Sequence, residues 1–265
     1  MMDRSLFTHP LEEKVLDDML EALKLKDQIE NYYIRYEEKK RRPDLLGKTL
    51  RVSQNQLPRI YKIAQAIEKK TNLPIPEMFV YEDFYYAIES KGMEKPWIEI
   101  SATLINDFTD QEIEFMLARE VFKVHYKQTY YNTLMLQSLD ALSKGLIPLG
   151  DGIVEDVAKV IYYRWSRVSN YAADSFGYVV CQNLEAASQA ILKTIFNSVL
   201  LAKNANLKEY IKQAEFINEL HDPISEATKS DEQYPYGPFR MKYLLAFATS
   251  ERAMKAKRLM TKEDE

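Results

Sequence analysis

Three charged residues stand close together in an otherwise apolar segment: Arg119, Glu120 and Lys123. The apolar residues around them recur at the spacing of one helix face: Ile113, Met116, Leu117, Val121 and Val124. Glu120 falls within this face, where a carboxylate is costly unless it is paired with a cation or takes part in chemistry. Glu120 is therefore either a general base or a counter-ion, and the counter-ion role is the one we favour.

The helix that carries these charges has a well-defined start. Thr109 and Glu112 have the spacing of a capping box, in which each side chain binds a backbone amide at the beginning of a helix. Arg119 and Lys123 then lie one turn apart, and two like charges at this spacing repel each other by about 0.3 kcal/mol. We therefore expect an anionic group to lie opposite them.

A second helical segment supplies a candidate for that group. Between residues 163 and 174, the side chains of Arg167, Asn170, Tyr171 and Asp174 fall on one helix face. Asp174 is the carboxylate of this face. We expect it to pair with one of the two cations of the first helix.

Together the two segments resemble the zinc metallopeptidase family that includes HtpX and the CAAX prenyl proteases. The first helix of that family carries H-E-x-x-H, in which two histidines bind zinc and the glutamate is the general base. The resemblance places Arg119 and Lys123 at the two histidine positions and retains Glu120. Neither cation is a donor to zinc.

The second helix of the family reads R-x-x-E-x-x-A-D. Its glutamate is the third zinc ligand, and its aspartate contacts a ligand histidine. Here Arg167, Ala173 and Asp174 match this pattern, whereas Asn170 stands at the position of the ligand glutamate. The resemblance therefore implies that all three protein ligands of the zinc ion are replaced and that Arg167 and Asp174 remain as supporting residues.

The resemblance continues from about residue 48 to the C-terminus. It includes a strand-then-helix entry, a strand after a proline, a short turn, a sheet-edge strand, and an H-P-x-x-x-x-R motif that has lost its histidine: residues 48–61, 73–81, 86–88, 97–101 and Tyr234-Pro235 with Arg240. It implies an α+β, predominantly helical, zincin-like fold with a small sheet packed on the motif helices. Residues 1–47 would form an N-terminal helical segment packed on a degenerate metallopeptidase-like domain of residues 48–265.

The local patterns predict particular elements. We expect helices over residues 10–42 that end near Arg42-Pro43, because the residue before a proline disfavours helical geometry. A helix is expected over residues 56–70. Short strands are expected at four places: residues 50–53, 78–81, 84–88 and 97–101.

Composition narrows the classes of partner. The chain has 265 residues and a formal charge of −4, which gives no electrostatic reason to expect binding to nucleic acid. No run of about 20 apolar residues predicts a membrane span, and no signal peptide is indicated. The single cysteine, Cys181, excludes an internal disulfide. We expect a cytoplasmic protein, whose oligomeric state the sequence does not determine.

Two functions follow from these patterns. In the first, the chain is a non-catalytic relative of the peptidases, without the zinc expected in active members, in which Arg119 and Lys123 pair with Glu120 and Asp174. It would serve as a structural module or bind a peptide or protein at the sheet edge near residues 97–101. In the second, it is an active metal-dependent endopeptidase with a non-standard site of oxygen ligands around Glu120 and Asp174.

Overall fold

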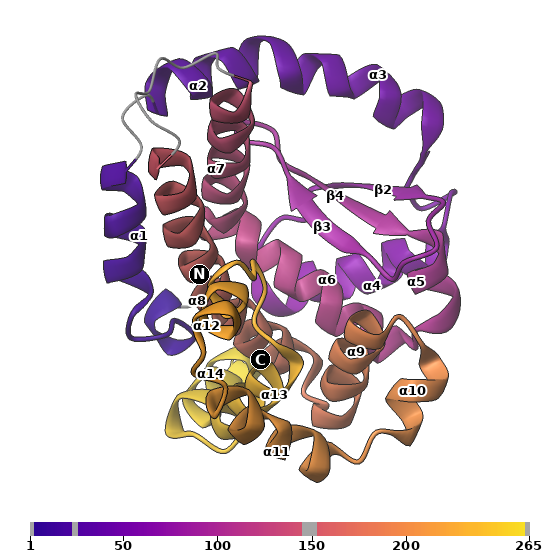
Figure 1. Cartoon of the computed structure of the whole chain (residues 1–265). Coiled ribbons are helices and arrows are strands. Elements are labelled where there is room, and N and C mark those ends of the chain that lie inside the picture. Colours follow the sequence, from indigo (N-terminus) through magenta and orange to yellow (C-terminus); the bar gives the residue numbers. More distant parts are fainter. Residues whose placement is uncertain (1–2, 23–25, 145–152, 263–265) are drawn as a thin grey trace.

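A computed structural model describes residues 3–22, 26–144 and 153–262 of the chain. The fold is α+β and mostly helical, with one small sheet near one end of the molecule (Figure 1). In the described part of the chain, every helix is too short or too polar to cross a lipid bilayer.

The sheet has four strands: β1 Leu50–Arg51, β2 Glu77–Tyr81, β3 Ile88–Lys91 and β4 Trp97–Ser101. Their order is β1-β2-β4-β3, with β2 and β4 parallel and the other neighbours antiparallel. Because β4 pairs on both sides, the expectation that residues 97–101 form the sheet edge is wrong. The edges are β1 and β3.

The predicted strand over residues 84–88 is also wrong, since β3 begins only at Ile88. The backbone before it is held by a side chain from another element. Asn197 accepts a hydrogen bond from the N–H of Tyr86 at 2.9 Å and donates one to the carbonyl oxygen of Phe84 at 3.1 Å. These contacts hold the segment as a loop against the end of a helix.

The first two N-terminal elements, η1 Arg4–Leu6 and α1 Glu12–Ala22, pack against α14 Glu251–Lys262 and α8 Ile153–Cys181, respectively. The next three arch over one side of the sheet (Figure 1): α2 Lys26–Tyr32, the π-helical turn Tyr33–Glu37, and α3 Glu38–Lys48. The predicted end near Arg42-Pro43 is wrong, because α3 continues through Pro43 to Lys48. Contacts beyond the proline hold the helix in place. Leu45 is buried against Phe79 and Trp97 of the sheet.

The opposite side of the sheet is covered by α4 Pro58–Thr71, α5 Ala102–Asp107 and α6 Asp110–His125. Helix α7 Gln128–Ser143 contacts strand β3, and α8 packs against α6 and α7. The capping box that predicted the start of α6 is confirmed. The hydroxyl of Thr109 accepts from the N–H of Glu112, and the Glu112 carboxylate accepts from the N–H of Thr109.

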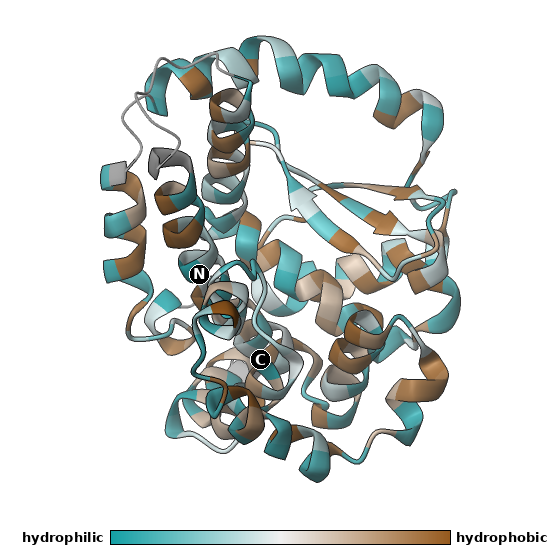
Figure 2. Cartoon of the chain, viewed as in Figure 1, coloured by the Kyte–Doolittle hydropathy of each residue, from teal (hydrophilic) through white to brown (hydrophobic). Residues whose placement is uncertain are grey.

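Four further helices pack against α8: α9 Leu184–Phe196, α12 Pro223–Ser230, α13 Gly237–Ala248 and α14 Glu251–Lys262. Helix α10 Val199–Asn204 packs on α9, and α11 Leu207–Asn218 packs on α13. Figure 2 shows that apolar residues concentrate where the helices pack together, and that α10 is apolar over much of its length.

One hydrophobic core joins the N-terminal residues to the rest of the molecule. Phe7 is fully buried, and its ring packs edge-on against Phe122 of α6 at 5.9 Å and Phe176 of α8 at 5.2 Å between ring centroids. The contact between α6 and α8 is close at Gly177. A Cβ atom there would lie only 2.8 Å from Cγ of Arg119 and 2.8 Å from the carbonyl oxygen of Phe115. This packing fixes the two helices that carry the charged residues.

Candidate functional site

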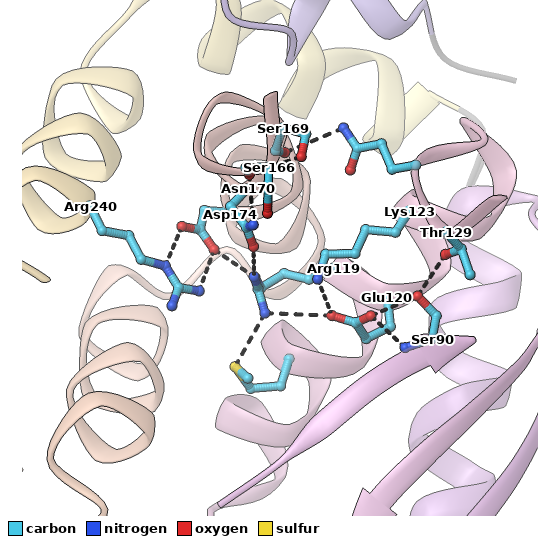
Figure 3. Close-up of polar contacts among 12 residues, drawn as sticks. Ser90, Arg119, Glu120, Lys123, Thr129, Ser166, Ser169, Asn170, Asp174 and Arg240 are labelled. Atoms are coloured by element: carbon cyan, nitrogen blue, oxygen red, sulfur yellow. Dashed lines mark hydrogen bonds and ion pairs between the residues drawn. The ribbon is translucent and has the colours of Figure 1, made fainter. Parts of the chain in front are cut away.

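Asp174 of α8 is the centre of one half of a buried ion cluster (Figure 3). Its Oδ1 atom accepts from Nε of Arg119 at 2.6 Å and from Nη2 of Arg240 at 2.7 Å, and its Oδ2 atom accepts from Nε of Arg240 at 2.6 Å. Asp174 is 0% exposed. Burial by itself would raise the pKa of this carboxyl, but Arg240 and Arg119 outweigh burial and hold the pKa below its ordinary value.

Glu120 of α6 is the centre of the other half. Its Oε1 atom accepts from Nζ of Lys123 at 2.8 Å, and its Oε2 atom accepts from both N and Oγ of Ser90 at 2.8 Å. The Ser90 hydroxyl also lies 2.7 Å from Oγ1 of Thr129. Glu120 is fully buried, which raises its pKa, but Lys123 and Arg119 outweigh burial and keep the pKa below its ordinary value. Both carboxylates therefore remain ionised at neutral pH.

Arg119 connects the two halves. Its guanidinium donates to Asp174 and lies 3.7 Å from Oε1 of Glu120, measured from Nη1. Its Nη2 atom also donates to Oδ1 of Asn170 at 3.0 Å, while Nδ2 of Asn170 donates to the backbone oxygen of Ser166 at 2.8 Å. The sequence prediction that Arg119 and Lys123 pair with Asp174 and Glu120 is confirmed by these contacts.

The side chains at this position do not fit a zinc ion. Arg119 and Lys123 offer only N–H donors, and the oxygen of Asn170 is already bonded to Arg119. Within the described residues, no three His, Cys, Asp or Glu side chains gather in a way that could hold a metal ion. A metal held by Glu120 and Asp174 would have to displace the cations that now bind both carboxylates.

A cleft of about 420 Å³ opens beside the cluster. Its polar floor includes Arg119, Glu120, Lys123 and Arg240, and its walls come from the edge strand β3, the loop before it, helices α7 to α9 and the loop before α13. The apolar part of the walls includes Tyr86, Ile88, Ile195 and Tyr234. The volume is within the range of small-ligand sites in proteins.

Not every residue of the predicted site belongs to the cluster. Arg167 lies on the same helix as Asp174, but its Nη1 atom donates to the backbone oxygens of Ser230 and Glu232. Arg167 therefore holds the loop after α12 and lies outside the ion cluster. The physical reason is that Arg119 and Arg240 already occupy the acceptors of Asp174.

Sequence reasoning missed part of the cluster. The sequence identifies Arg240 only as part of a motif near the C-terminus, and that motif predicts no contact between Arg240 and Asp174. No sequence pattern points to Ser90 or Thr129, because a single hydroxyl residue in a strand or at a helix start carries no pattern of its own. The signal that could have pointed to them is the demand of a buried carboxylate for several hydrogen-bond donors, which one lysine does not satisfy.

Removing the ammonium of Lys123 should destabilise the protein. We expect Lys123→Ala to lower the free energy of unfolding by about 2 kcal/mol, because Glu120 would keep its bonds to Ser90 but lose its nearest cation. Urea unfolding at neutral pH measures this change. Lys123→Met, which keeps most of the side-chain volume, should show a similar loss. An unchanged midpoint in both variants would contradict a buried ion cluster.

Comparison with protein-family models, with curated proteins and with solved structures finds no match to this chain.

Proposed function

We propose that this chain is a zincin-like domain whose catalytic metal site has been replaced by an ion cluster, and that it works as a peptide- or protein-binding module. One observation supports the proposal above all others. Arg119, Lys123 and Asn170, the three positions that the resemblance assigns to zinc ligands, come together beside Glu120 in a single cleft. Positions 51 residues apart in the sequence would not be expected to meet at one site by chance.

The environment of Glu120 argues against hydrolysis by this site. In a zinc peptidase the metal polarises the carbonyl group and lowers the pKa of bound water, and the glutamate accepts the proton. Here both carboxylate oxygens of Glu120 are already bonded, one to Lys123 and the other to Ser90. A carboxylate that is held ionised by these donors is a weak base, because its pKa lies below the ordinary value.

The edge strand beside the cleft supports peptide binding. The N–H of Ser101 donates to the carbonyl oxygen of Ala87 at 2.9 Å. Because hydrogen-bonded residues alternate along an antiparallel pair, Glu89 and Lys91 of β3 also direct their backbone groups toward β4. The backbone groups of Ile88 and Ser90 point the other way. Glu120 already accepts from the N–H of Ser90, which leaves Ile88 as the place where an extended peptide would pair with the edge.

Three measurements on the purified protein test the proposal. Elemental analysis after expression in zinc-rich medium should find far less than one equivalent of metal, and a casein cleavage assay should give no chelator-sensitive signal. A fluorescent peptide library should contain binders with micromolar affinity, which is typical of short peptides in shallow clefts. Stoichiometric metal with chelator-sensitive cleavage would instead establish the endopeptidase alternative, and silence across the library would leave only a structural role.

A further inference from the structure

The floor of the cleft has more hydrogen-bond donors than acceptors. The ammonium of Lys123 makes one hydrogen bond to other described residues, to Glu120, although it carries three N–H groups. Arg240 uses its Nε and Nη2 atoms on Asp174, and its Nη1 atom has no partner among the described residues. In contrast, the oxygens of both carboxylates are already bonded by cations or by Ser90.

The charges of the floor show the same imbalance. Cations outnumber carboxylates: Arg119, Lys123 and Arg240 against Glu120 and Asp174. Glu89 also lines the cleft, but two cations outside its lining, Lys91 and Arg41, balance Glu89 together with Glu99. The Lys91 ammonium lies 3.5 Å from Glu89 and 3.1 Å from Glu99, and Arg41 lies 3.2 Å from Glu99. Lys123 is the cation of this floor that is most open to the cleft, with its side chain 17% exposed. A ligand with one negative charge would neutralise the excess positive charge on the floor of the cleft.

Burial lowers the pKa of Lys123, and the positive charge of Arg119 lowers it further. Glu120 and, to a smaller extent, Glu89 oppose this effect but do not cancel it. An additional anion next to the ammonium would therefore be favourable, because it would stabilise the charged form of Lys123.

Part of the lining of the cleft is apolar and exposed. Tyr86 lines the cleft, and the two residues before it in the loop, Phe84 and Tyr85, have exposed fractions of 89% and 66%. Ile195 and Tyr234 also line the cleft and are partly exposed. Exposed aromatic groups are typical of contact surfaces. An anion suited to this site would thus be carried on an apolar body.

We propose that the cleft recognises a peptide in which one acidic side chain is flanked by apolar residues, with the carboxylate directed to Lys123 and the apolar groups on the apolar part of the lining. This inference rests on the proposed function and adds the chemical class of the ligand. The backbone groups of Ile88 pair with the peptide, and the ladder ends at Ser90 because Glu120 accepts from its N–H. The acidic side chain then lies close to the free N–H groups of the floor.

Three matched peptides test the inference on the unaltered protein by calorimetric titration: Ac-Phe-Glu-Phe-NH2, its Gln analogue and its Lys analogue. We expect the Glu peptide to bind about tenfold more tightly than the Gln peptide, because its contacts with Lys123 are charge-assisted. The Lys peptide should bind more weakly than both. The preference for Glu over Gln should shrink when the salt concentration rises from about 20 to about 200 mM.

Two variants locate the preference. Lys123→Met should bring the Glu and Gln peptides to equal affinity, whereas Lys123→Arg, which keeps the charge, should retain the preference for Glu. If the unaltered protein binds the Glu and Gln peptides equally, the proposed preference for an acidic side chain is wrong, but the proposal that the cleft binds peptides is retained. If none of the three peptides binds and the peptide library is silent as well, the proposed function fails and this inference fails with it.

Discussion

Replacing Asp174 by asparagine should destabilise the fold by about 3 to 5 kcal/mol, because the amide would leave the buried Arg240 without a counter-charge and Arg119 with only the more distant Glu120 at 3.7 Å. Arg119 and Arg240 both donate to this carboxylate at 2.6 Å, and neither has another carboxylate within 3.5 Å among the described residues. Asparagine has nearly the same shape as aspartate, so the loss would report charge and not volume. Urea unfolding at neutral pH measures it.

An exposed ion pair provides the control for this experiment. Asp140 and Lys144 form a pair at 2.6 Å whose side chains are half exposed, and Asp140→Asn should cost less than about 1 kcal/mol. A loss at Asp174 no larger than the loss at Asp140 would contradict the importance of the cluster.

The cost of Asp174→Asn should also depend on pH. The pKa of Asp174 is lower in the folded protein than in the unfolded chain, so its ionisation stabilises the fold above the unfolded pKa of about 3.9. That stability is lost as the pH falls through the folded pKa. The difference between the two proteins should therefore shrink below about pH 4.

Restoring the three zinc ligands should create a metal site if the chain has the ancestry that we propose. The triple variant Arg119→His, Lys123→His and Asn170→Glu places two imidazoles one helical turn apart on α6 and a carboxylate on α8, facing the same cleft. We expect it to bind about one equivalent of zinc, and we expect chelation of the metal to lower its melting temperature. Elemental analysis and thermal unfolding with and without chelator measure both effects.

The matched control for this variant carries alanine at the same three positions. It removes the same cations without adding ligands, so it should bind no more zinc than the unaltered protein. Metal binding by both variants would indicate a site elsewhere in the chain. If the triple variant folds, with an unaltered circular dichroism spectrum, but binds no zinc, the geometry of these helices is unsuited to the metal and the proposed ancestry is wrong.

The ion cluster was largely predictable from local sequence because helices have a fixed period. The capping box at Thr109 set the start of α6, and the period of 3.6 residues then placed Glu120 on its buried face. Because buried charges need partners, the two cations of α6 also predicted an ion pair with Asp174. Arg240 and Ser90 come from distant elements, and no local pattern says which face of one helix will meet another.

The sheet was less predictable, and the two errors in it have different causes. The segment 84–88 is rich in residues that favour strands, but Asn197 binds its backbone and prevents pairing. The position of β4 in the middle of the sheet depends on a parallel pairing with β2, and strand order is a property of the whole chain. Similarly, Pro43 stays helical because buried contacts of Leu45 outweigh the local preference of proline.

The absence of a side chain at Gly177 limits which sequences can carry this cluster. A methyl group at this position would meet the backbone oxygen of Phe115 as well as Cγ of Arg119, each at 2.8 Å, so a shorter residue at position 119 would relieve only one of the two contacts. Relatives of this chain should therefore keep glycine three residues after the aspartate, whichever residue faces it from the other helix. That glycine would help to find distant homologues in genome sequences where the individual motifs are too degenerate to detect.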